Sequence, residues 1–320
     1  MEHKFIVSSS PHIHKKESVS DIMLDCIIAL LPATFMGIYC FGIKAALVIL
    51  TAIASSILSE YAYQKLMKKP VTTGDLSAMV TGLLIGLNMP PTIPLWMVII
   101  GSAFAIIIVK QLYGGLGKNY LNPALAARCF MLVAWAGAMT SFTEPFLGAD
   151  AVSTATPLAV LKGTSQGTLP TAFQAFMGVT SGCIGETSAI MLLIGAIYLL
   201  LKRVITLRIP LSYIITFAVL TFIFGKNDIL MSQLDYTLMH LISGGLIIGA
   251  FFMATDYTTT PTTKLGQIIF GFGCGLLTFV IRQFGGYPEG VSFSILLMNI
   301  VTPLIDKYTA PKKFGAVKSK

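Results

Sequence analysis

The sequence predicts an all-α polytopic membrane protein with about ten transmembrane helices, arranged as two inverted five-helix repeats. Of its 320 residues, 55% are hydrophobic and only 11% are charged, and the mean hydropathy is +0.80. Long apolar runs recur along the chain, and short motifs of the first half reappear in the second. Because a soluble domain carries about 25% charged residues, most of this chain is expected to lie in lipid.

Apolar runs of about 17–25 residues are typical of membrane helices. The predicted spans are, in order, 22–43, 45–64, 76–91, 93–112, 122–139, 184–201, 207–225, 237–255, 264–284 and 290–308. The third run is short because it ends in the helix-breaking sequence "NMPP". The first twenty residues are polar and contain no signal peptide, so we expect the first span to target the chain to the membrane.

The distribution of positive charge predicts the orientation of the spans. Of the 22 Lys and Arg residues, seventeen fall on the side of the N-terminus and four on the opposite side. Since cytoplasmic loops are enriched in Lys and Arg, both termini are expected in the cytoplasm. The same asymmetry accounts for the net charge of +8, so the basic composition indicates no nucleic-acid partner.

The spans and loops divide the chain into five parts. They are a cytoplasmic tail over 1–20, a first repeat over 21–139, an extracytoplasmic loop over 140–183, a second repeat over 184–308 and a basic cytoplasmic tail over 309–320.

The repeat is predicted from two pairs of matching segments in the same order. "GLLIGL" (82–87) resembles "GLIIGA" (245–250), and "VKQLYGGLGKN" (109–119) resembles "IRQFGGYPEG" (281–290). Each half then holds five spans, and an odd number of spans makes the two copies inverted. Such repeats place ligands near the midplane, at breaks in helices. Chance similarity among apolar, glycine-rich segments is the alternative.

The cysteines and histidines predict no metal or cluster site. None of the cysteines forms a C-x-x-C pair, and the four histidines lack metal-ligand spacing. Small buried thiols are the expected state of Cys26, Cys40, Cys129, Cys183 and Cys274.

Several motifs in a fixed order carry a family resemblance that extends from about residue 20 to 306. They are "GGLGKNYLNPA" (114–124), "STATPLA" (153–159), "GETSA" (185–189), "ATDYTTTPTTKLGQIIFG" (254–271) and "IRQFGGYPEGVSFSILLMNIVTPLID" (281–306). This set resembles the D subunit of Rnf complexes, the ion-translocating ferredoxin:NAD oxidoreductases. It is also similar to the B subunit of sodium-pumping NADH:quinone reductases, but the absence of a long N-terminal extension favours the Rnf subunit.

The resemblance implies a membrane electron-transfer subunit of a redox-driven, cation-translocating complex in the bacterial cytoplasmic membrane. Such a translocase subunit is not catalytically complete alone. Its implied partners are other membrane and peripheral subunits of the Rnf complex, including an extracytoplasmic flavoprotein, a flavin transferase for maturation, and the lipid bilayer. The family fold is similar to that of urea transporters, so a channel or secondary transporter without a redox cofactor is the alternative. A membrane scaffold for redox partners is a third possibility.

The resemblance also implies a covalent flavin on the loop over 140–183. In the family, the last threonine of an S-[GT]-A-T motif carries FMN through a phosphoester, and the match is Thr156. The family more often has glycine at the position of Thr154, which here adds a hydroxyl beside Ser153. A threonine hydroxyl does not attack phosphorus unaided, so attachment needs a transferase and an exposed loop. The alternative for Thr156 is a helix N-cap, because Pro157 follows it.

A second, noncovalent flavin, such as riboflavin, is implied within the membrane part. In "GGLGKNYLNP", Gly115 and Gly117 would pack against the flavin, with Asn119 and Asn122 as hydrogen-bond donors. A glycine-hinged turn is the alternative. The stretch is not a phosphate-binding P-loop, because Lys118 is followed by asparagine.

Three ionisable residues near or within spans are further candidates. Arg128 lies inside the fifth span, where it could bind a flavin or another anionic group, or extend to the interface. Asp256 and Glu186 lie at span ends, where each could supply a carboxylate for a coupling cation or cap a helix. We assign no catalytic residue and no metal ligand from the sequence.

Overall fold

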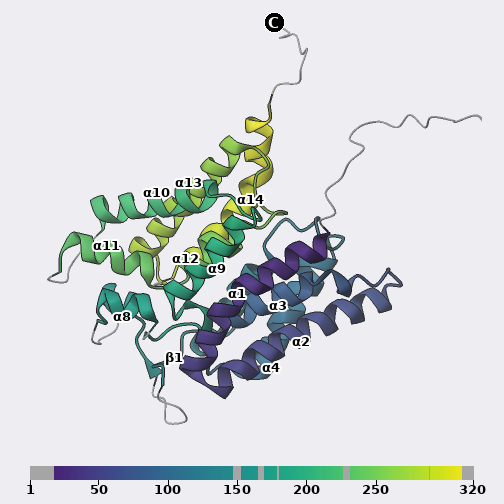
Figure 1. Cartoon of the computed structure of the whole chain (residues 1–320), viewed down its shortest axis with the longest axis horizontal. Coiled ribbons are helices and arrows are strands. Elements are labelled where there is room, and N and C mark those ends of the chain that lie inside the picture. The colour runs from purple at the N-terminus through teal and green to yellow at the C-terminus, as the bar shows by residue number, and fades with distance from the viewer. Residues whose placement is uncertain are drawn as a thin grey trace, which may run out of the picture.

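The computed structural model describes residues 18–146, 153–164, 169–178, 180–225, 231–287 and 289–311. Within these ranges the chain is helical apart from one two-stranded pairing, which agrees with the predicted all-α class. Figure 1 shows the N-terminal helices, purple to blue, on one side of the molecule and the C-terminal helices, green to yellow, on the other. Most of the two predicted cytoplasmic tails lies outside the described residues.

The N-terminal elements are α1 (Val19–Phe41), α2 (Ile43–Leu66), η1 (Thr73–Asp75), α3 (Ser77–Leu87), α4 (Leu95–Ala103), the π-helix η2 (Phe104–Gln111), α5 (Pro123–Ala134) and α6 (Ala136–Met139). The loop over 140–183 contributes β1 (Phe142–Thr143), β2 (Ser153–Thr154), α7 (Pro157–Leu161) and α8 (Ala172–Met177). The C-terminal elements are η4 (Ile184–Glu186), α9 (Ala189–Leu201), α10 (Arg208–Phe224), α11 (Gln233–Ile242), α12 (Leu246–Ile248), the π-helix η5 (Gly249–Met253), α13 (Lys264–Phe284) and α14 (Val291–Thr309).

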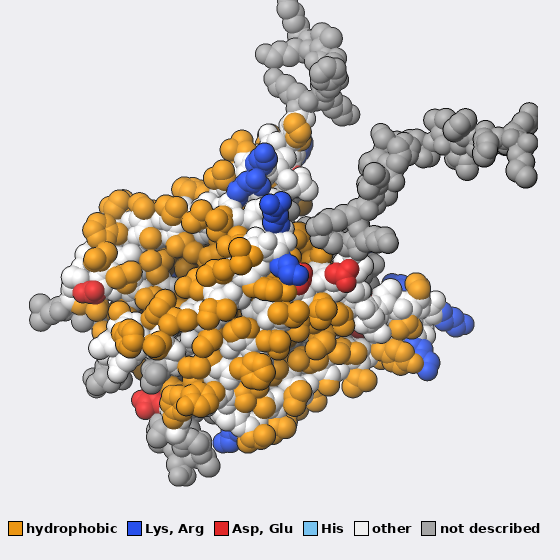
Figure 2. Space-filling view, in the orientation of Figure 1, with side chains coloured by type: hydrophobic (Ala, Val, Ile, Leu, Met, Phe, Trp, Pro, Cys, Tyr) orange, Lys and Arg blue, Asp and Glu red, His pale blue; other side chains and the backbone are white. Residues whose placement is uncertain are grey.

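Helices coincide with each of the ten predicted spans, but they differ in length. Among the described residues, four helices, α1, α2, α13 and α14, are long and apolar enough to cross a membrane alone. A fifth crossing forms if α11 and Leu246–Met253, bent by 61° at a short break, count as one span. The other predicted spans contain apolar helices of 10–17 residues, so neither the number ten nor the inverted repeat is established. Hydrophobic side chains cover most of the face seen in Figure 2, as a multi-pass membrane protein requires.

Helix starts follow from capping residues in the sequence. Ser18 and Asp21 form a capping box at α1, and Thr263 accepts a bond from the Gly266 amide at α13. Asn122 caps α5 and is followed by proline at the first helical position. These side chains satisfy amide groups that a helix N-terminus leaves unpaired.

Small residues let neighbouring helices approach closely, both between the two parts and within the N-terminal part. On α9, Gly195 faces α1, and a Cβ atom there would overlap the carbonyl oxygen of Ala29. On α3, Gly82 faces α2, where a Cβ would lie 2.7 Å from the carbonyl oxygen of Ala52. Both contacts are with backbone atoms, which cannot rotate away as a side chain can. The glycines therefore set how near these helices pack.

Replacing Gly195 with valine should destabilise the folded chain by about 3 kcal/mol, because overpacking against a helix backbone forces α1 and α9 apart. The thermal unfolding temperature of the detergent-solubilised chain measures this effect. Gly137→Ala in α6 is the matched control, since a Cβ at Gly137 meets no atom within 4 Å. Equal unfolding temperatures for the two variants would contradict the close α1–α9 packing.

A buried ion pair joins α2 to the end of η2. The Lys110 ammonium donates to both carboxylate oxygens of Glu60, at 2.9 and 3.0 Å, and to the Ser77 hydroxyl at 2.6 Å. Gln111 adds a bond to the same carboxylate at 2.6 Å. Lys110 is 2% exposed and Glu60 is fully buried, so this pair is one cation matched to one anion in the interior. Its complete hydrogen bonding offsets the desolvation of the two charges.

Candidate functional site

Thr156 lies in the loop over 140–183, directly after a short strand. The strands β1 and β2 pair antiparallel, with Phe142 opposite Thr154 and Thr143 opposite Ser153. Thr156 is the N-cap of α7, and its Oγ1 accepts a hydrogen bond from the Ala159 amide at 3.3 Å. The helix-cap alternative considered for this residue is therefore confirmed, with Pro157 in the first turn. Thr156 is 6% exposed, so its hydroxyl is less accessible than the sequence led us to expect of an attachment site.

A cleft of about 270 Å³ lies beside Thr156, bordered by its chain neighbours Ala155 and Pro157. The rest of its lining is Glu144, Pro145, Leu169, Pro170, Gln174, Thr180 and Ser181. Ser181 Oγ donates to the Ala155 carbonyl at 2.8 Å, which fixes the segment at the cleft edge. The Thr154 Oγ1 is buried and has no partner among the described residues.

These features fit a phosphoester-linked flavin on Thr156. The ester would replace one long cap bond, and the unpartnered Thr154 hydroxyl is a hydrogen-bond donor next to the site. The cleft beside Thr156 would hold part of such a group. Because Thr156 is largely buried, its hydroxyl would be reached only if α7 opened locally.

Lys162, at the end of α7, connects the Thr156 segment to the α13–α14 connection. Its ammonium donates to the carbonyl oxygens of Gly285 at 2.5 Å and Tyr287 at 3.0 Å. Partial burial lowers the pKa of Lys162 below its ordinary value. On the same helix, Leu158 and Leu161 pack in a small hydrophobic cluster with Ala175, Tyr236 and Met239. These contacts hold α7 against α8, α11 and the end of α13.

The glycine-rich turn before α5 borders two pockets at the opposite end of the molecule. Gly114, Gly115 and Gly117 have φ values of +114°, +93° and +87°, so the glycine-hinged turn considered from the sequence is present. Asn119 lines both pockets, and Gly117 lines the wider one, of about 690 Å³. Gly115 lines neither of these two pockets.

The narrower of the two, which we call the inner pocket, is lined by both apolar and polar side chains. Apolar wall residues include Val80, Leu84, Phe251 and Phe252. Its polar lining consists of Ser77, Thr81, Lys110, Asn119, Asn122, Thr255, Asp256, Tyr257 and Thr258, besides Cys26. A flat ligand with an apolar body and polar edges suits such a lining, but the pocket holds only about 100 Å³ and would have to widen to admit a flavin ring.

Two of the predicted polar residues in the inner pocket already have partners. Asn122 Oδ1 accepts from the amides of Ala124 and Leu125, and its Nδ2 donates to the Met253 carbonyl at 3.2 Å. The Asp256 carboxylate accepts from the hydroxyls of Thr258 and Thr259. Asn122 is thus an N-cap that joins α5 to η5, while Asp256 anchors a threonine-rich turn at the pocket wall.

Arg128 lies at the centre of a buried cluster where the N-terminal and C-terminal helices meet. Its Nη1 donates to Asn88 Oδ1 at 2.5 Å and to Glu186 Oε1 at 2.9 Å. Its Nη2 donates to Cys183 Sγ at 3.4 Å and forms an ion pair with Glu289. Arg128 is 6% exposed, so the alternative in which it extends to the membrane interface is wrong. The Glu186 carboxylate forms a second ion pair with Arg128.

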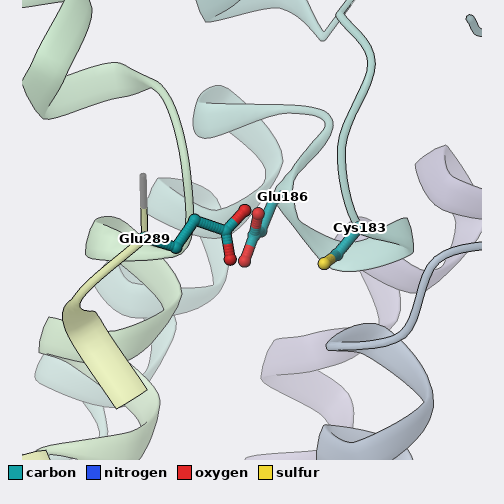
Figure 3. Close-up of side chains that lie close together, drawn as sticks. All are labelled: Cys183, Glu186 and Glu289. Atoms are coloured by element: carbon teal, nitrogen blue, oxygen red, sulfur yellow. The ribbon is translucent and has the colours of Figure 1, made fainter. Parts of the chain in front are cut away.

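Neither Glu289 nor the pairing of Cys183 was predicted from the sequence. Glu289 lies within the motif over 281–306 and Cys183 just before "GETSA", and a carboxylate inside the apolar, glycine-rich "GGYPEGV" was the available signal. Figure 3 shows Cys183, Glu186 and Glu289 pointing toward a common point. Their ligand atoms lie within 4.8 Å of one another, a spacing that could hold a metal ion. Arg128 donates to all three, so the guanidinium supplies the positive charge there.

A second buried arginine lies near the cluster, at the break between α11 and α12. Arg282 donates to the carbonyl oxygens of His240 at 2.5 Å and Ser243 at 3.4 Å, and its guanidinium stacks on Phe217. These carbonyls belong to the C-terminal end of α11, where a positive charge is favourable. Arg282 is 2% exposed. The break contacts both arginines, because a Cβ at Gly244 would lie 3.1 Å from Arg282 Nη2 and a Cβ at Gly245 would lie 3.5 Å from Arg128 Nη1.

Comparison with known proteins agrees with the resemblance found in the motifs. Residues 6–315 match the model of the NQR2, RnfD, RnfE family. The chain is 49% identical to the D subunit of the Na(+)-translocating ferredoxin:NAD(+) oxidoreductase complex of Acetobacterium woodii, over 98% of this chain and 96% of that protein. It is also 49% identical to the D subunit of the proton-translocating ferredoxin:NAD(+) oxidoreductase complex of Clostridium ljungdahlii, over 97% and 96% of the two chains. Identity to the D subunit of the ion-translocating oxidoreductase complex of Cronobacter sakazakii is 38%, over 97% and 99%. With a family match over nearly its whole length, the chain belongs to the NQR2, RnfD, RnfE family.

Proposed function

We propose that this chain is the membrane electron-transfer subunit of a redox-driven, cation-translocating ferredoxin:NAD oxidoreductase complex. The observation that carries the proposal is the 49% identity, over nearly the full length, to the D subunits of two such complexes. The chain has no nicotinamide-binding fingerprint and no cluster cysteines in its sequence, so ferredoxin and NAD would bind other subunits. Those subunits, an extracytoplasmic flavoprotein among them, are the expected partners, together with a flavin transferase.

In this proposal, Thr156 holds FMN through a phosphoester, and a bound flavin supplies one- and two-electron transfer. The Thr156 oxygen anchors the phosphate, and the Thr154 hydroxyl donates to it. Lys162, bonded to the carbonyls of Gly285 and Tyr287, keeps α7 and the anchor in place. The segment faces the outside of a bacterial cytoplasmic membrane, with both termini in the cytoplasm, as the Lys and Arg distribution predicts.

The inner pocket is the proposed site of a second, noncovalent flavin such as riboflavin. Phe251 and Phe252 would contact the ring faces, and Asn119 would face the polar edge. Gly115 and Gly117 form the turn that precedes Asn119 at the border of the inner pocket. Arg128 would bind an anionic group only by giving up one of its four present acceptors.

Asp256 and Glu186 are the proposed carboxylates for cation coupling. Moving one charge against the membrane potential costs about 2.3 kcal/mol per 100 mV, which electron transfer must supply. Asp256 borders the inner pocket, and Glu186 lies in the Arg128 cluster. A redox change near either carboxylate would alter its affinity for a cation.

The covalent flavin is tested by mass spectrometry of the peptide that contains residues 150–162, prepared from the chain purified from its native host. We expect an added mass equal to an FMN phosphoester on Thr156. The same peptide from a host without the flavin transferase is the control and should be unmodified. An unmodified peptide from the native host would instead favour the channel or transporter alternative.

The second flavin is tested by denaturing the chain purified from its native host and separating free from protein-bound flavin. We expect one equivalent to stay on the chain and one to be released. Val80→Trp, which places an indole in the inner pocket, should reduce only the released equivalent by about tenfold. Ile99→Trp on the exposed face of α4 is the matched control and should release as much flavin as the wild type.

A further inference from the structure

The carboxyl groups of Glu186 and Glu289 lie close together although they come from distant parts of the chain. Glu186 ends η4, and Glu289 lies in the connection between α13 and α14, outside both helices. Figure 3 shows the two carboxyl groups facing each other, and their oxygens are within 4.8 Å. Two like charges this close, in a largely buried place, oppose each other's ionisation.

The positive charge that contacts the pair is a single guanidinium. Among the described residues, Arg128 alone forms ion pairs with Glu186 and Glu289. Arg282, the nearby cation of α13, instead donates to the carbonyls of His240 and Ser243. From the side of α7, Lys162 donates to backbone carbonyls of the α13–α14 connection. Cys183 of the η4 segment also receives a bond from Arg128.

The Arg128 cluster differs from the Lys110–Glu60 ion pair in the ratio of negative to positive charges. The Glu60 carboxylate is matched one to one by the Lys110 ammonium and is fully bonded. At the Arg128 cluster, two carboxylates compete for one guanidinium, which also donates to Asn88. The direct contacts therefore leave one negative charge in excess, and a bound proton would remove it.

We propose that Glu186 and Glu289 bind one exchangeable proton between them, held mainly on Glu289. The Glu289 side chain is 20% exposed against 3% for Glu186, so a proton on Glu289 can exchange with water. The side chain is otherwise buried, and this burial, together with the charge of Glu186, raises the pKa of Glu289 to about 7, while Arg128 and Arg282 oppose the shift.

Protonation would alter the link between the two parts of the molecule. The proton would come from water and convert one carboxylate to a neutral acid, with no redox change in the protein. Arg128 would then bind Glu186 and Asn88 more strongly than Glu289, freeing the α13–α14 connection on one side. Lys162 of α7 donates to carbonyls of the same connection, so a movement of this connection would also shift α7 and Thr156.

Infrared difference spectroscopy of the purified full chain tests the proposal without reference to any flavin. We expect a carbonyl-stretch band of one protonated, buried carboxyl at pH 6 that is lost as the pH rises to 8.5. Glu289→Gln should abolish the band and Glu186→Gln should remove or shift it, while Glu144→Gln, at an exposed position in the loop over 140–183, should leave it unchanged. A wild-type spectrum with no such band, or a band that persists in Glu289→Gln, would overturn the shared proton.

Thermal unfolding gives a second measurement. A carboxyl with a raised pKa in the folded state contributes stability below its ordinary pKa, and this stability is lost as the pH rises through the raised value. The unfolding temperature of the wild type should therefore fall relative to Glu289→Gln between pH 5 and pH 8. Parallel pH profiles of the two proteins would count against the proposal even if the variant folds normally.

Discussion

Replacing Thr156 with alanine is expected to abolish the proposed covalent flavin and, with it, the proposed electron transfer through the complex. Alanine has no side-chain oxygen, so no phosphoester can form at this position. The measurement is in-gel fluorescence of the denatured chain from its native host, where the wild-type band should be bright and the variant dark. Turnover of the assembled complex should fall by at least a hundredfold, because a step of its electron path is lost.

Neighbouring hydroxyls provide matched controls for Thr156. Thr154→Ala should keep the fluorescent band, although losing a donor beside the phosphate should lower the yield of modification. Thr156→Ser retains an oxygen at the attachment position and should give partial fluorescence. A bright band in Thr156→Ala that disappears only when Thr154 is also replaced would move the attachment to Thr154. A dark wild-type band would contradict flavin attachment altogether.

Replacing Arg128 with leucine should have the largest effect on stability in this protein. The substitution leaves the Glu186 and Glu289 carboxyls in a buried place without their ion-pair partner. Breaking a buried pair from one side costs about 3–5 kcal/mol, and here two carboxylates lose the same guanidinium. A membrane protein of ordinary stability, about 5–15 kcal/mol, would lose much of its folded population. The yield of monodisperse chain in detergent and its unfolding temperature measure the loss.

The compensated variant separates lost charge balance from lost packing. Combining Arg128→Leu with Glu186→Gln and Glu289→Gln removes the orphaned charges and should recover a large part of the stability. If the triple variant unfolds at the same temperature as Arg128→Leu alone, the ion pairs would not be the source of the effect. Asn88→Ala, which removes an uncharged acceptor of Arg128, should cost only about 1 kcal/mol.

The helices were predictable because hydrophobicity and capping act over short stretches of sequence. The predicted span over 264–284 has the same bounds as α13, and that over 290–308 differs from α14 by one residue at each end. Asn122 before Pro123, and Thr156 before Pro157, indicate helix starts that the structure contains. In each case the residues that decide the element are within a few positions of it.

The breaks and the short helices were less predictable. The span expected over 237–255 is bent by 61° between α11 and α12, where Gly244 has a φ of +71° and carbonyls of α11 bond to Arg282. The arginine that makes this bend tolerable lies some forty residues further along the chain. Hydropathy alone reports a continuous apolar run there, so the break could not be seen.

The membrane class, the approximate helix bounds, the family and the motif that contains Thr156 could all be read from the amino-acid order, since each depends on local composition or on sequence along the chain. Three-dimensional packing was needed to show that Thr156 is largely buried, that Arg128 faces two carboxylates, and that Lys162 ties α7 to the α13–α14 connection. Glu289 lies 161 residues from Arg128 in sequence, and no local pattern specifies which distant charge a buried guanidinium will meet. Packing of the two groups of helices makes that choice, because a buried charge is stable only where the fold brings it a partner.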